Sequence, residues 1–317
     1  MDRDNNIIQW LLSFDNPSLT FRTYTELLDY NPDSPEVIKV KNKIAFSHDV
    51  GKIMEAMHPD GYWLQKQYDG KIVGDDVEYG SFATTHFCLS YLAELGMTRE
   101  HPFIYKAAER YLNLQKKDGD WWQHLSCLTG YNISTFIKLG YKNDSRIQKS
   151  IDLMLKTNRF DSGYLCDIHE KNEKSKKKKS CIRGAAKVLS AFSLLPEYWE
   201  HARCKELVNY FLNRGGFYKS GKNTVLVNKD INTLTFPVIW RTNSWEILLA
   251  LSKMGYGKDL RLENAWKFLD SLKNKNNRYN LDYTPPQALW KVGVRGSENP
   301  WITFYVFLTK KYRENKI

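Results

Sequence analysis

The chain of 317 residues is 42% hydrophobic and 14% aromatic, enough to build a large core, and it carries a formal net charge of +11. No stretch approaches the roughly 18 continuous apolar residues that span a bilayer, and the start is too polar for a signal peptide. These features exclude the membrane and secretory classes from the prediction and favour a cytoplasmic protein. Five cysteines in such a chain favour reduced thiols or metal ligands over a disulfide framework.

The N-terminal region, residues 1–34, is predicted to be a short helical cap. Apolar residues around Trp10 and Tyr24 suggest two amphipathic helices, with Asn16-Pro17-Ser18 between them. The chain is expected to form one domain, with this cap at its start and residues 35–317 as its main part. The main part begins with a helix over about 35–57 that is broken near 48–51.

Pairs of helical segments then follow one another along the chain. In the first member of each pair, apolar residues recur at helical spacing and charges fill the other face, which predicts an outer helix with one wet side. The second members have few charges and many Ala, Ser, Thr and aromatic residues, which predicts buried inner helices. We expect outer helices over 103–115, 145–157, 204–212 and 260–273, and inner helices over 82–95, 128–139, 182–195, 237–254 and 301–311.

Three of the inner helices are expected to end at glycine caps, at Gly96, Gly140 and Gly255. Turns that carry Gly or Asn with an aromatic residue recur roughly every 45 to 65 residues, as expected of helical hairpins in a repeat array. Alternation of wet and dry helices, repeated five times, predicts an all-α fold in which an inner ring of helices is wrapped by an outer ring.

One segment resembles a known family. Its residues Lys106-Ala107, Tyr111-Leu112, Gln115, Gly119 and Trp121 are similar to the Gln-Trp motif of squalene and hopene cyclases, although the spacing is one residue short between Leu112 and Gln115. The chain, over roughly residues 35–312, resembles the α/α-toroid superfamily of these cyclases and of protein prenyltransferase catalytic subunits. It is most similar to small prokaryotic prenyltransferase-like and squalene-cyclase-like proteins, through Cys127-Leu128-Thr129-Gly130, Tyr164-Leu165-Cys166 and Cys181 at the start of an inner helix. The resemblance implies a toroid enzyme that takes an isoprenoid or another hydrophobic substrate in its central cavity.

The rim formed by the N-terminal ends of the inner helices is the expected place for chemistry, because helix amides and dipoles favour anions there. Cys127, Cys166 and Cys181 are predicted to meet on this rim, and His169 is the candidate fourth ligand of a zinc site, with His124 or Asp167 behind it. Packing as small apolar residues is the alternative role for these cysteines. The prenyltransferase zinc ligands are not reproduced, since Lys179 occupies the place of their Asp.

Catalytic candidates are His86, Asp75, Asp76 and Arg241. An inward imidazole could act as a general base, the paired carboxylates could share a proton and supply an acid, and the guanidinium could hold an anion. The Asp-x-Asp-Asp acid of the cyclases is absent. A hydrogen-bonded packing role for His86 and Arg241, and a solvated loop for the two Asp residues, are the alternatives.

The run from Lys171 to Lys179 falls between two of the rim cysteines and could attract a diphosphate-bearing substrate, although its composition is also that of a solvated loop. No nucleic-acid module, phosphate-binding glycine loop or His-Glu-x-x-His zinc helix occurs in the sequence. Three functions stay open: an isoprenoid cyclase-like or transferase-like enzyme, a lipid- or peptide-binding toroid with structural zinc, and a toroid lyase or hydrolase of carbohydrate.

Overall fold

The computed structural model describes residues 2–66, 72–73, 84–121, 124–169, 178–238, 241–286 and 288–314. This part of the chain is mostly helical, with two short antiparallel sheets of two strands each, β1 with β2 and β3 with β4. The elements are α1 Asp2–Leu12, α2 Pro17–Arg22, the π-helical turn η1 Thr23–Leu27, α3 Pro35–Ile44, α4 His48–Glu55, β1 Gln65–Lys66, β2 Ile72–Val73, α5 Thr85–Glu94, α6 Pro102–Leu112, α7 Ser126–Lys138, α8 Ser145–Lys156, α9 Ile182–Phe192, α10 Ala202–Leu212, β3 Tyr218–Lys219, β4 Lys222–Leu226, α11 Ser244–Lys253, α12 Glu263–Ser271 and α13 Pro300–Glu314.

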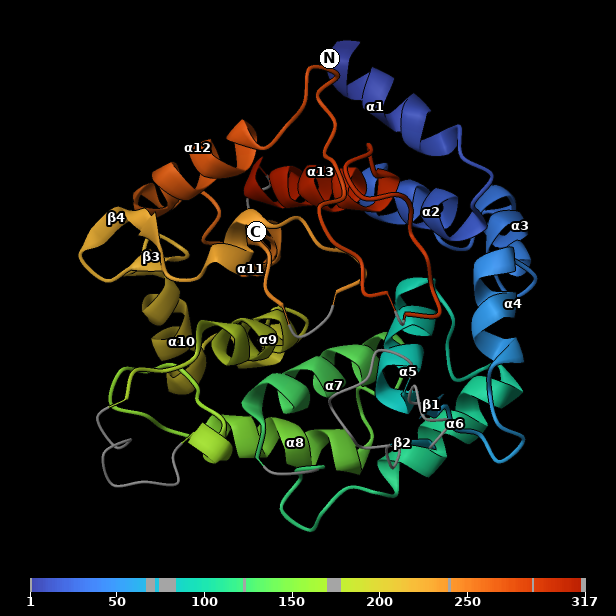
Figure 1. Ribbon diagram of the computed structural model, residues 1–317, viewed down its shortest axis with the longest axis horizontal. Helices are drawn as coiled ribbons and strands as arrows, with labels where there is room; N and C mark the ends of the chain where they lie inside the picture. Colours follow the sequence, from blue (N-terminus) through green and yellow to red (C-terminus); the bar gives the residue numbers. More distant parts are fainter. Residues whose placement is uncertain are drawn as a thin grey trace.

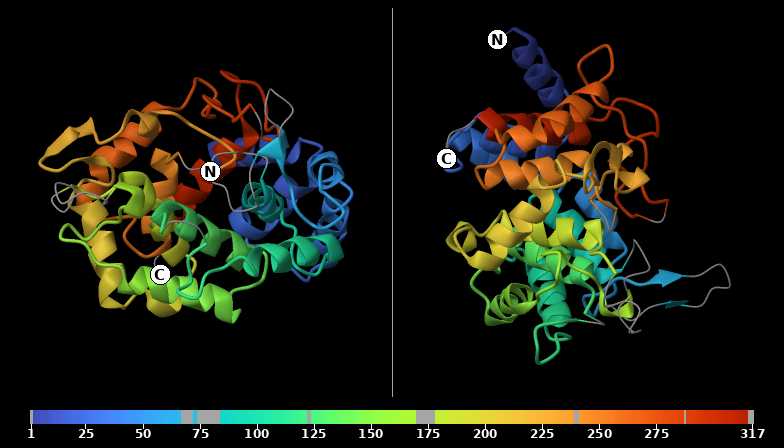
Figure 2. Two further views of the ribbon diagram at one scale, coloured as in Figure 1. Left: turned by 60° about the horizontal axis from the view of Figure 1, so that its bottom comes forward. Right: turned by 90° about the vertical axis from the view of Figure 1, so that its left-hand side faces the viewer.

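The helices are arranged in two layers around a common centre (Figure 1). In the inner layer, α5 packs on α7, α7 on α9, α9 on α11 and α11 on α13. In the outer layer, α6, α8, α10 and α12 each cover the inner helix that precedes them or lies beside them. Figure 2 shows the same layering from two further directions, with β1 and β2 standing out from one side.

Burial explains which helix belongs to which layer. Every residue of α5 is buried, as expected of a helix that is covered on all sides. In the outer helix α8 only Ile147, Ser150, Ile151 and Met154 are buried, at the spacing of a single helical stripe. The predicted division into outer helices with one solvent-exposed face and fully buried inner helices is therefore confirmed for α8 and α5.

The predicted glycine caps are confirmed by the backbone. Gly96, Gly140 and Gly255 have φ angles of +89°, +94° and +88°, and they directly follow the last turns of α5, α7 and α11. Side chains rarely adopt this left-handed conformation, so glycine ends these helices without strain.

The Gln-Trp segment connects two outer helices. The Gln115 side-chain amide donates to the backbone carbonyl of Arg146 at 2.6 Å and to the Ser150 hydroxyl at 2.8 Å. Ser150 in turn donates to the carbonyl of Gly119, where a Cβ would lie only 2.6 Å from the Lys149 carbonyl oxygen. In this chain the motif therefore ties the turn after α6 to α8, which is a structural role.

The N-terminal cap takes part in closing the ring. The Lys311 ammonium of α13 donates to the carbonyl of Glu26 in η1 at 2.8 Å. Arg22, the last residue of α2, reaches the carboxylate of Glu94 in α5 and lies 4.9 Å from the ring of Tyr305 in α13. The boundary of the cap near residue 34 stays a prediction. The Arg22 side chain of the cap nevertheless packs against the inner helices α5 and α13.

Three details of the elements differ from the sequence expectation. The inner helix expected over 237–254 begins only at Ser244, because the side chain of Asn243 bonds both backbone groups of Thr235 and holds the preceding chain in an open loop. The break in the first long helix falls at 45–47 instead of 48–51, since the Ser47 hydroxyl caps α4. The four short strands were not predicted: three of them have only two residues, too few to show alternation, and β4 has only five.

Candidate functional site

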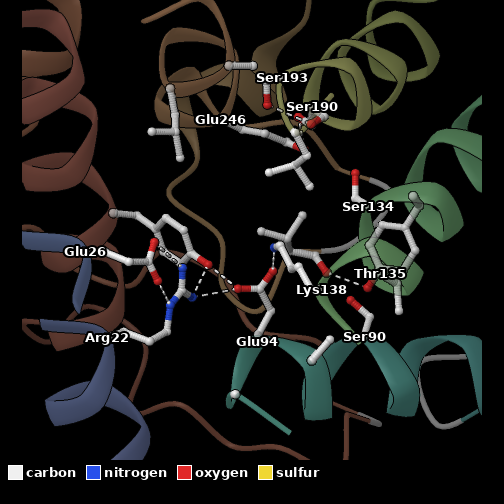
Figure 3. A pocket seen from close by; sticks show the side chains of 18 of the residues that line it. Arg22, Glu26, Ser90, Glu94, Ser134, Thr135, Lys138, Ser190, Ser193 and Glu246 are labelled. Carbon is white, nitrogen blue, oxygen red and sulfur yellow. Dashed lines mark hydrogen bonds and ion pairs between the residues drawn. The ribbon is translucent and has the colours of Figure 1, made fainter. Parts of the chain in front are cut away.

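A cavity of about 400 Å³ lies inside the ring, between the inner helices and the N-terminal cap (Figure 3). Its volume falls in the range of roughly 300 to 1,000 Å³ that small-molecule sites occupy. Polar and charged side chains from α2, η1, α3, the inner helices and the turns after α5 and α9 line it: Arg22, Glu26, Lys41, Ser90, Glu94, Thr98, Tyr131, Ser134, Thr135, Lys138, Lys187, Ser190, Ser193, Glu246, Lys253 and Tyr305.

The cavity lies toward the C-terminal ends of the inner helices. Glu94, Lys138 and Lys253 are the last residues of α5, α7 and α11, and all three line it. The expectation that chemistry gathers at the N-terminal rim stays a prediction. That rim is described only in part, because residues 74–83, 122–123, 170–177 and 239–240 precede four of the inner helices and lie outside the described residues.

Glu94 is the centre of a buried charge cluster (Figure 3). Its carboxylate, with the residue 4% exposed, accepts hydrogen bonds from Arg22 Nη1 at 2.8 Å, from Lys138 Nζ and from the Tyr305 hydroxyl. Burial alone would raise the pKa of Glu94, but the charges of Lys138 and Arg22 and the hydrogen bonds to it outweigh burial and lower the pKa to about 2. Glu94 is therefore ionised at neutral pH and is a poor proton donor.

Arg22 also pairs with a second carboxylate, that of Glu26. Its guanidinium also donates to Glu26, from Nη2 to Oε2 at 3.0 Å and from Nε to Oε1. The cluster thus joins the N-terminal cap, α5, α7 and α13 through one arginine and one glutamate, which fixes the wall of the cavity at the place where the ring closes.

A second buried pair lies on the opposite wall. Lys187 of α9, 1% exposed, donates from Nζ to Glu246 Oε1 of α11 at 2.6 Å and to the backbone carbonyl of Arg241 at 2.9 Å. Burial lowers the pKa of Lys187, and the Glu246 carboxylate opposes this shift. Within the described part of the chain, Glu246 Oε2 is buried without a hydrogen-bond partner.

Lys253 is the cation with the most unusual environment. Partly buried at the end of α11, it lies 5.2 Å from the ring of Tyr312. Burial lowers the pKa of Lys253 to about 8, while Glu26 opposes the shift and Lys138 and Arg22 add to it. Its ammonium therefore begins to lose its proton just above neutral pH.

The lining carries a surplus of positive charge. Five cationic side chains face three carboxylates, namely Arg22, Lys41, Lys138, Lys187 and Lys253 against Glu26, Glu94 and Glu246. Apolar side chains share the wall: Phe21, Leu194, Val238, Trp245, Leu249 and Ala250. The arrangement can hold a molecule that has an anionic group and an apolar part.

Of the predicted catalytic residues, the structure describes His86 and Arg241, and neither lines this cavity. His86 is 1% exposed, its Nδ1 lies 3.3 Å from the Thr84 hydroxyl, and burial lowers its pKa to about 3, so the imidazole is neutral. Arg241 stacks on Tyr283, with its Cζ 4.0 Å from the ring centroid. Asp75 and Asp76 lie outside the described residues, as do residues 171–177 of the lysine run.

The predicted metal ligands come together only in part. The sulfurs of Cys127 and Cys166 lie 3.7 Å apart, and the hydrogen bond between them, followed by burial, raises the pKa of Cys166. Cys181 precedes α9, His169 ends a short 3-10 turn, and His124 Nε2 lies 3.1 Å from Asp118 Oδ2. No group of three His, Cys, Asp or Glu side chains that could hold a metal ion occurs among the residues the structure describes.

The remaining cysteines are packing residues. Cys88 and Cys204 are completely buried, and burial raises the pKa of both.

Sequence reasoning missed the charged lining of the cavity. Glu94, Lys187 and Glu246 are isolated charges in otherwise apolar inner helices, as in Ala185-Ala186-Lys187-Val188-Leu189. Such residues are seldom buried unless they are paired. A search for isolated charged residues in the most apolar predicted helices would have found them.

No described helix has both the length and the apolar character needed to cross a membrane. No protein-family profile matches the sequence, and no curated protein matches it.

Solved structures are similar over nearly the whole chain. A glycosyl hydrolase of family 88 from Bacteroides vulgatus has a TM-score of 0.55 at 14% identity, over 97% of both chains. A polysaccharide lyase has a TM-score of 0.52 at 11% identity, over 99% of this chain and 97% of its own. A type II terpene cyclase from Scytonema reaches a TM-score of 0.35 at 12% identity, over 86% of this chain and 97% of its own. At these identities the first two similarities show a shared fold of paired helices and leave the reaction open.

Proposed function

We propose that the chain is an α/α-toroid enzyme whose central cavity binds a small molecule with an anionic group and an apolar part. The observation that carries the proposal is the lining of the cavity, where five cations outnumber three carboxylates beside an apolar wall. The successive contacts of α5, α7, α9, α11 and α13 around this cavity, and the two neighbours of similar fold, support the toroid.

The surplus charge resides mainly on Lys41 and Lys253. Arg22, Lys138 and Lys187 are each neutralised by a glutamate within hydrogen-bond distance, so the positive potential that remains comes from the other two lysines. Inside a partly enclosed cavity of low dielectric, such a surplus attracts an anion more strongly than it would on an open surface.

An isoprenoid diphosphate, the substrate class implied by the sequence, has both required features. Its diphosphate would face the lysines, and its chain would lie against Phe21, Val238 and Trp245. Of the two reactions expected from the sequence, transfer with departure of the diphosphate suits this lining better than cyclisation started by an acid. Cations can stabilise the leaving group, whereas the pKa of Glu94 is lowered to about 2.

Zinc is not used in this proposal. Two thiols cannot complete the three or four protein ligands that zinc requires, and the described residues supply no third ligand beside them. The zinc expectation stays a prediction of the sequence.

An acidic carbohydrate is the second candidate ligand. Hydroxyl groups of Ser90, Ser134, Thr135, Ser190 and Ser193 line one side of the cavity and could bond the hydroxyls of a sugar. The two neighbours with the higher TM-scores are named as a glycosyl hydrolase and a polysaccharide lyase, which favours this candidate as an analogy of fold.

Ligand-induced thermal stabilisation distinguishes the candidates. The purified protein is heated with geranyl diphosphate, inorganic diphosphate, geraniol, glucuronic acid or glucose. Geranyl diphosphate should raise the Tm most, inorganic diphosphate less and geraniol not at all, because the anion and the apolar chain both contribute. A rise with glucuronic acid alone would favour the carbohydrate. Equal rises with charged and uncharged ligands, or none, would refute the proposal.

A matched pair of variants locates the binding. Ser134→Phe places a ring in the cavity, whereas Ser271→Phe places the same ring on the exposed side of α12. The first should abolish the Tm rise with geranyl diphosphate and the second should keep it. If both variants keep the Tm rise, the ligand binds outside this cavity.

A further inference from the structure

Cys127 and Cys166 are neighbouring cysteines at the start of α7 and in the segment before α9. Neither is in a disulfide, and their sulfurs lie 3.7 Å apart. A disulfide bond measures about 2.05 Å, so the two sulfurs need to approach by less than about 2 Å. This is within the reach of side-chain rotation and small backbone shifts.

The backbone around the two thiols is held together by hydrogen bonds. The Ser126 hydroxyl donates to the carbonyl of Leu165 at 3.3 Å, and the amide of Asp167 donates to the carbonyl of His124 at 3.4 Å. The segment that carries Cys166 is thereby fixed against the first turn of α7, which keeps the sulfurs adjacent.

The two sulfurs have different exposure and different partners. Cys166 is 4% exposed and packs with Leu125 and Leu128, whereas Cys127 is partly exposed. The backbone amides of Ser126 and Cys127, at the start of α7, donate to the Cys166 sulfur. These amides favour the Cys166 thiolate, but the hydrogen bond with Cys127 and burial outweigh them and raise the pKa of Cys166, so Cys166 is the poorer first nucleophile. Cys127 can therefore meet an external reagent, and Cys166 is placed to react with it second.

We propose that Cys127 and Cys166 are a reversible dithiol–disulfide couple that exchanges with low-molecular-weight disulfides. The Cys127 thiolate attacks one sulfur of the small disulfide, which breaks the small disulfide bond and releases one thiol. The Cys166 thiolate then attacks the Cys127 sulfur of the mixed disulfide and releases the second thiol. Overall, two protein thiols and one small disulfide become one protein disulfide and two small thiols, so atoms and electrons balance.

The disulfide would brace the ring at the start of an inner helix. It would link the first turn of α7 to the segment between α8 and α9, closing a loop of about 40 residues, and such a closure restricts the unfolded chain. Oxidised protein should therefore unfold at a higher temperature than reduced protein.

The test equilibrates the full-length protein with mixtures of reduced and oxidised glutathione, followed by alkylation and mass spectrometry. In the wild type we expect one internal disulfide per chain, in a peptide pair that contains Cys127 and Cys166, reversed by excess reduced glutathione. Cys166→Ser should instead accumulate glutathione on Cys127, because the second attack is removed. Cys127→Ser should form neither product at this pair.

Cys181→Ser is the matched control, since Cys181 is also partly exposed but lies at the start of α9. This variant should form the Cys127–Cys166 disulfide as the wild type does. The proposal is wrong if the wild type accumulates only the mixed disulfide on Cys127, if the internal disulfide involves Cys181, or if no product forms at any glutathione ratio. Circular dichroism of each variant verifies folding, so a failed fold cannot be mistaken for a failed exchange.

Discussion

Replacing Glu94 with glutamine is expected to lower the free energy of unfolding by about 3 kcal/mol near pH 7. The folded protein holds this carboxylate against Arg22, Lys138 and Tyr305, and the pKa of Glu94 falls from its ordinary 4.5 to about 2. A shift of this size corresponds to about 3 kcal/mol of stability. Glutamine keeps the size of the side chain but removes the negative charge that pairs with Arg22 and Lys138.

The pH dependence of this effect has a definite sign. Because the pKa of Glu94 is lower in the folded state, its contribution is fully present above about pH 4.5 and is lost as the pH falls toward about 2. The difference between wild type and Glu94→Gln should therefore shrink through this window. Urea unfolding of both proteins at several pH values measures it.

A surface glutamate provides the control for this prediction. Glu197 pairs with Lys142 at 3.0 Å, but both side chains are about two-fifths exposed. Glu197→Gln should change the free energy of unfolding by less than about 1 kcal/mol, as exposed pairs usually do. If Glu94→Gln also lowers the free energy of unfolding by less than about 1 kcal/mol, or if its effect does not depend on pH, the cluster does not stabilise the closure of the ring.

Replacing Lys187 with methionine is expected to lower the free energy of unfolding by about 3 to 5 kcal/mol. Lys187 is 1% exposed and Glu246 is 5% exposed, and their ion pair is 2.6 Å long. Removing the lysine leaves the glutamate charge buried without its partner, which is the costly way to break such a pair. Urea unfolding near pH 7 is the measurement.

Two further variants make this prediction specific to the buried pair. The double variant Lys187→Met with Glu246→Met should recover most of the loss, since neither charge then remains in the interior. Lys267→Met removes the ion pair between Lys267 and Glu263 on α12, where both side chains are more than half exposed. This variant should lower the free energy of unfolding by less than about 1 kcal/mol. A double variant as unstable as the single one would mean that packing, and not charge, explains the effect.

The architecture was largely readable from the sequence because it depends on local signals. Charge on one face separates α8 from α5, and Gly96, Gly140 and Gly255 end the inner helices where left-handed backbone is required. Errors arose where contacts between distant segments override these signals. At α11, for example, Asn243 reaches back to Thr235 and delays the start of the helix.

The site was harder to predict for a physical reason. Residues that meet at the centre of a ring come from helices far apart in the chain, so no spacing in the sequence reveals that Arg22 and Tyr305 both contact Glu94. The cysteine pair was predicted to be adjacent and is, but the third and fourth ligands do not join it in the described part of the chain. Sequence reasoning also placed the chemistry at the N-terminal rim, which stays a prediction because segments before four of the inner helices lie outside the described residues.

The affinity for geranyl diphosphate, measured by calorimetry near pH 7 and near pH 9, tests the charged cavity most directly. Because burial lowers the pKa of Lys253 to about 8, its protonated fraction falls about 10-fold between these pH values, and the wild type should bind up to about 10-fold more weakly at the higher pH. Lys253→Arg should keep its affinity at both pH values, since arginine stays charged. Lys253→Met should bind weakly at both. Equal wild-type affinity at the two pH values, together with a Lys253→Met variant that binds as well as the wild type, would contradict an anion site in this cavity.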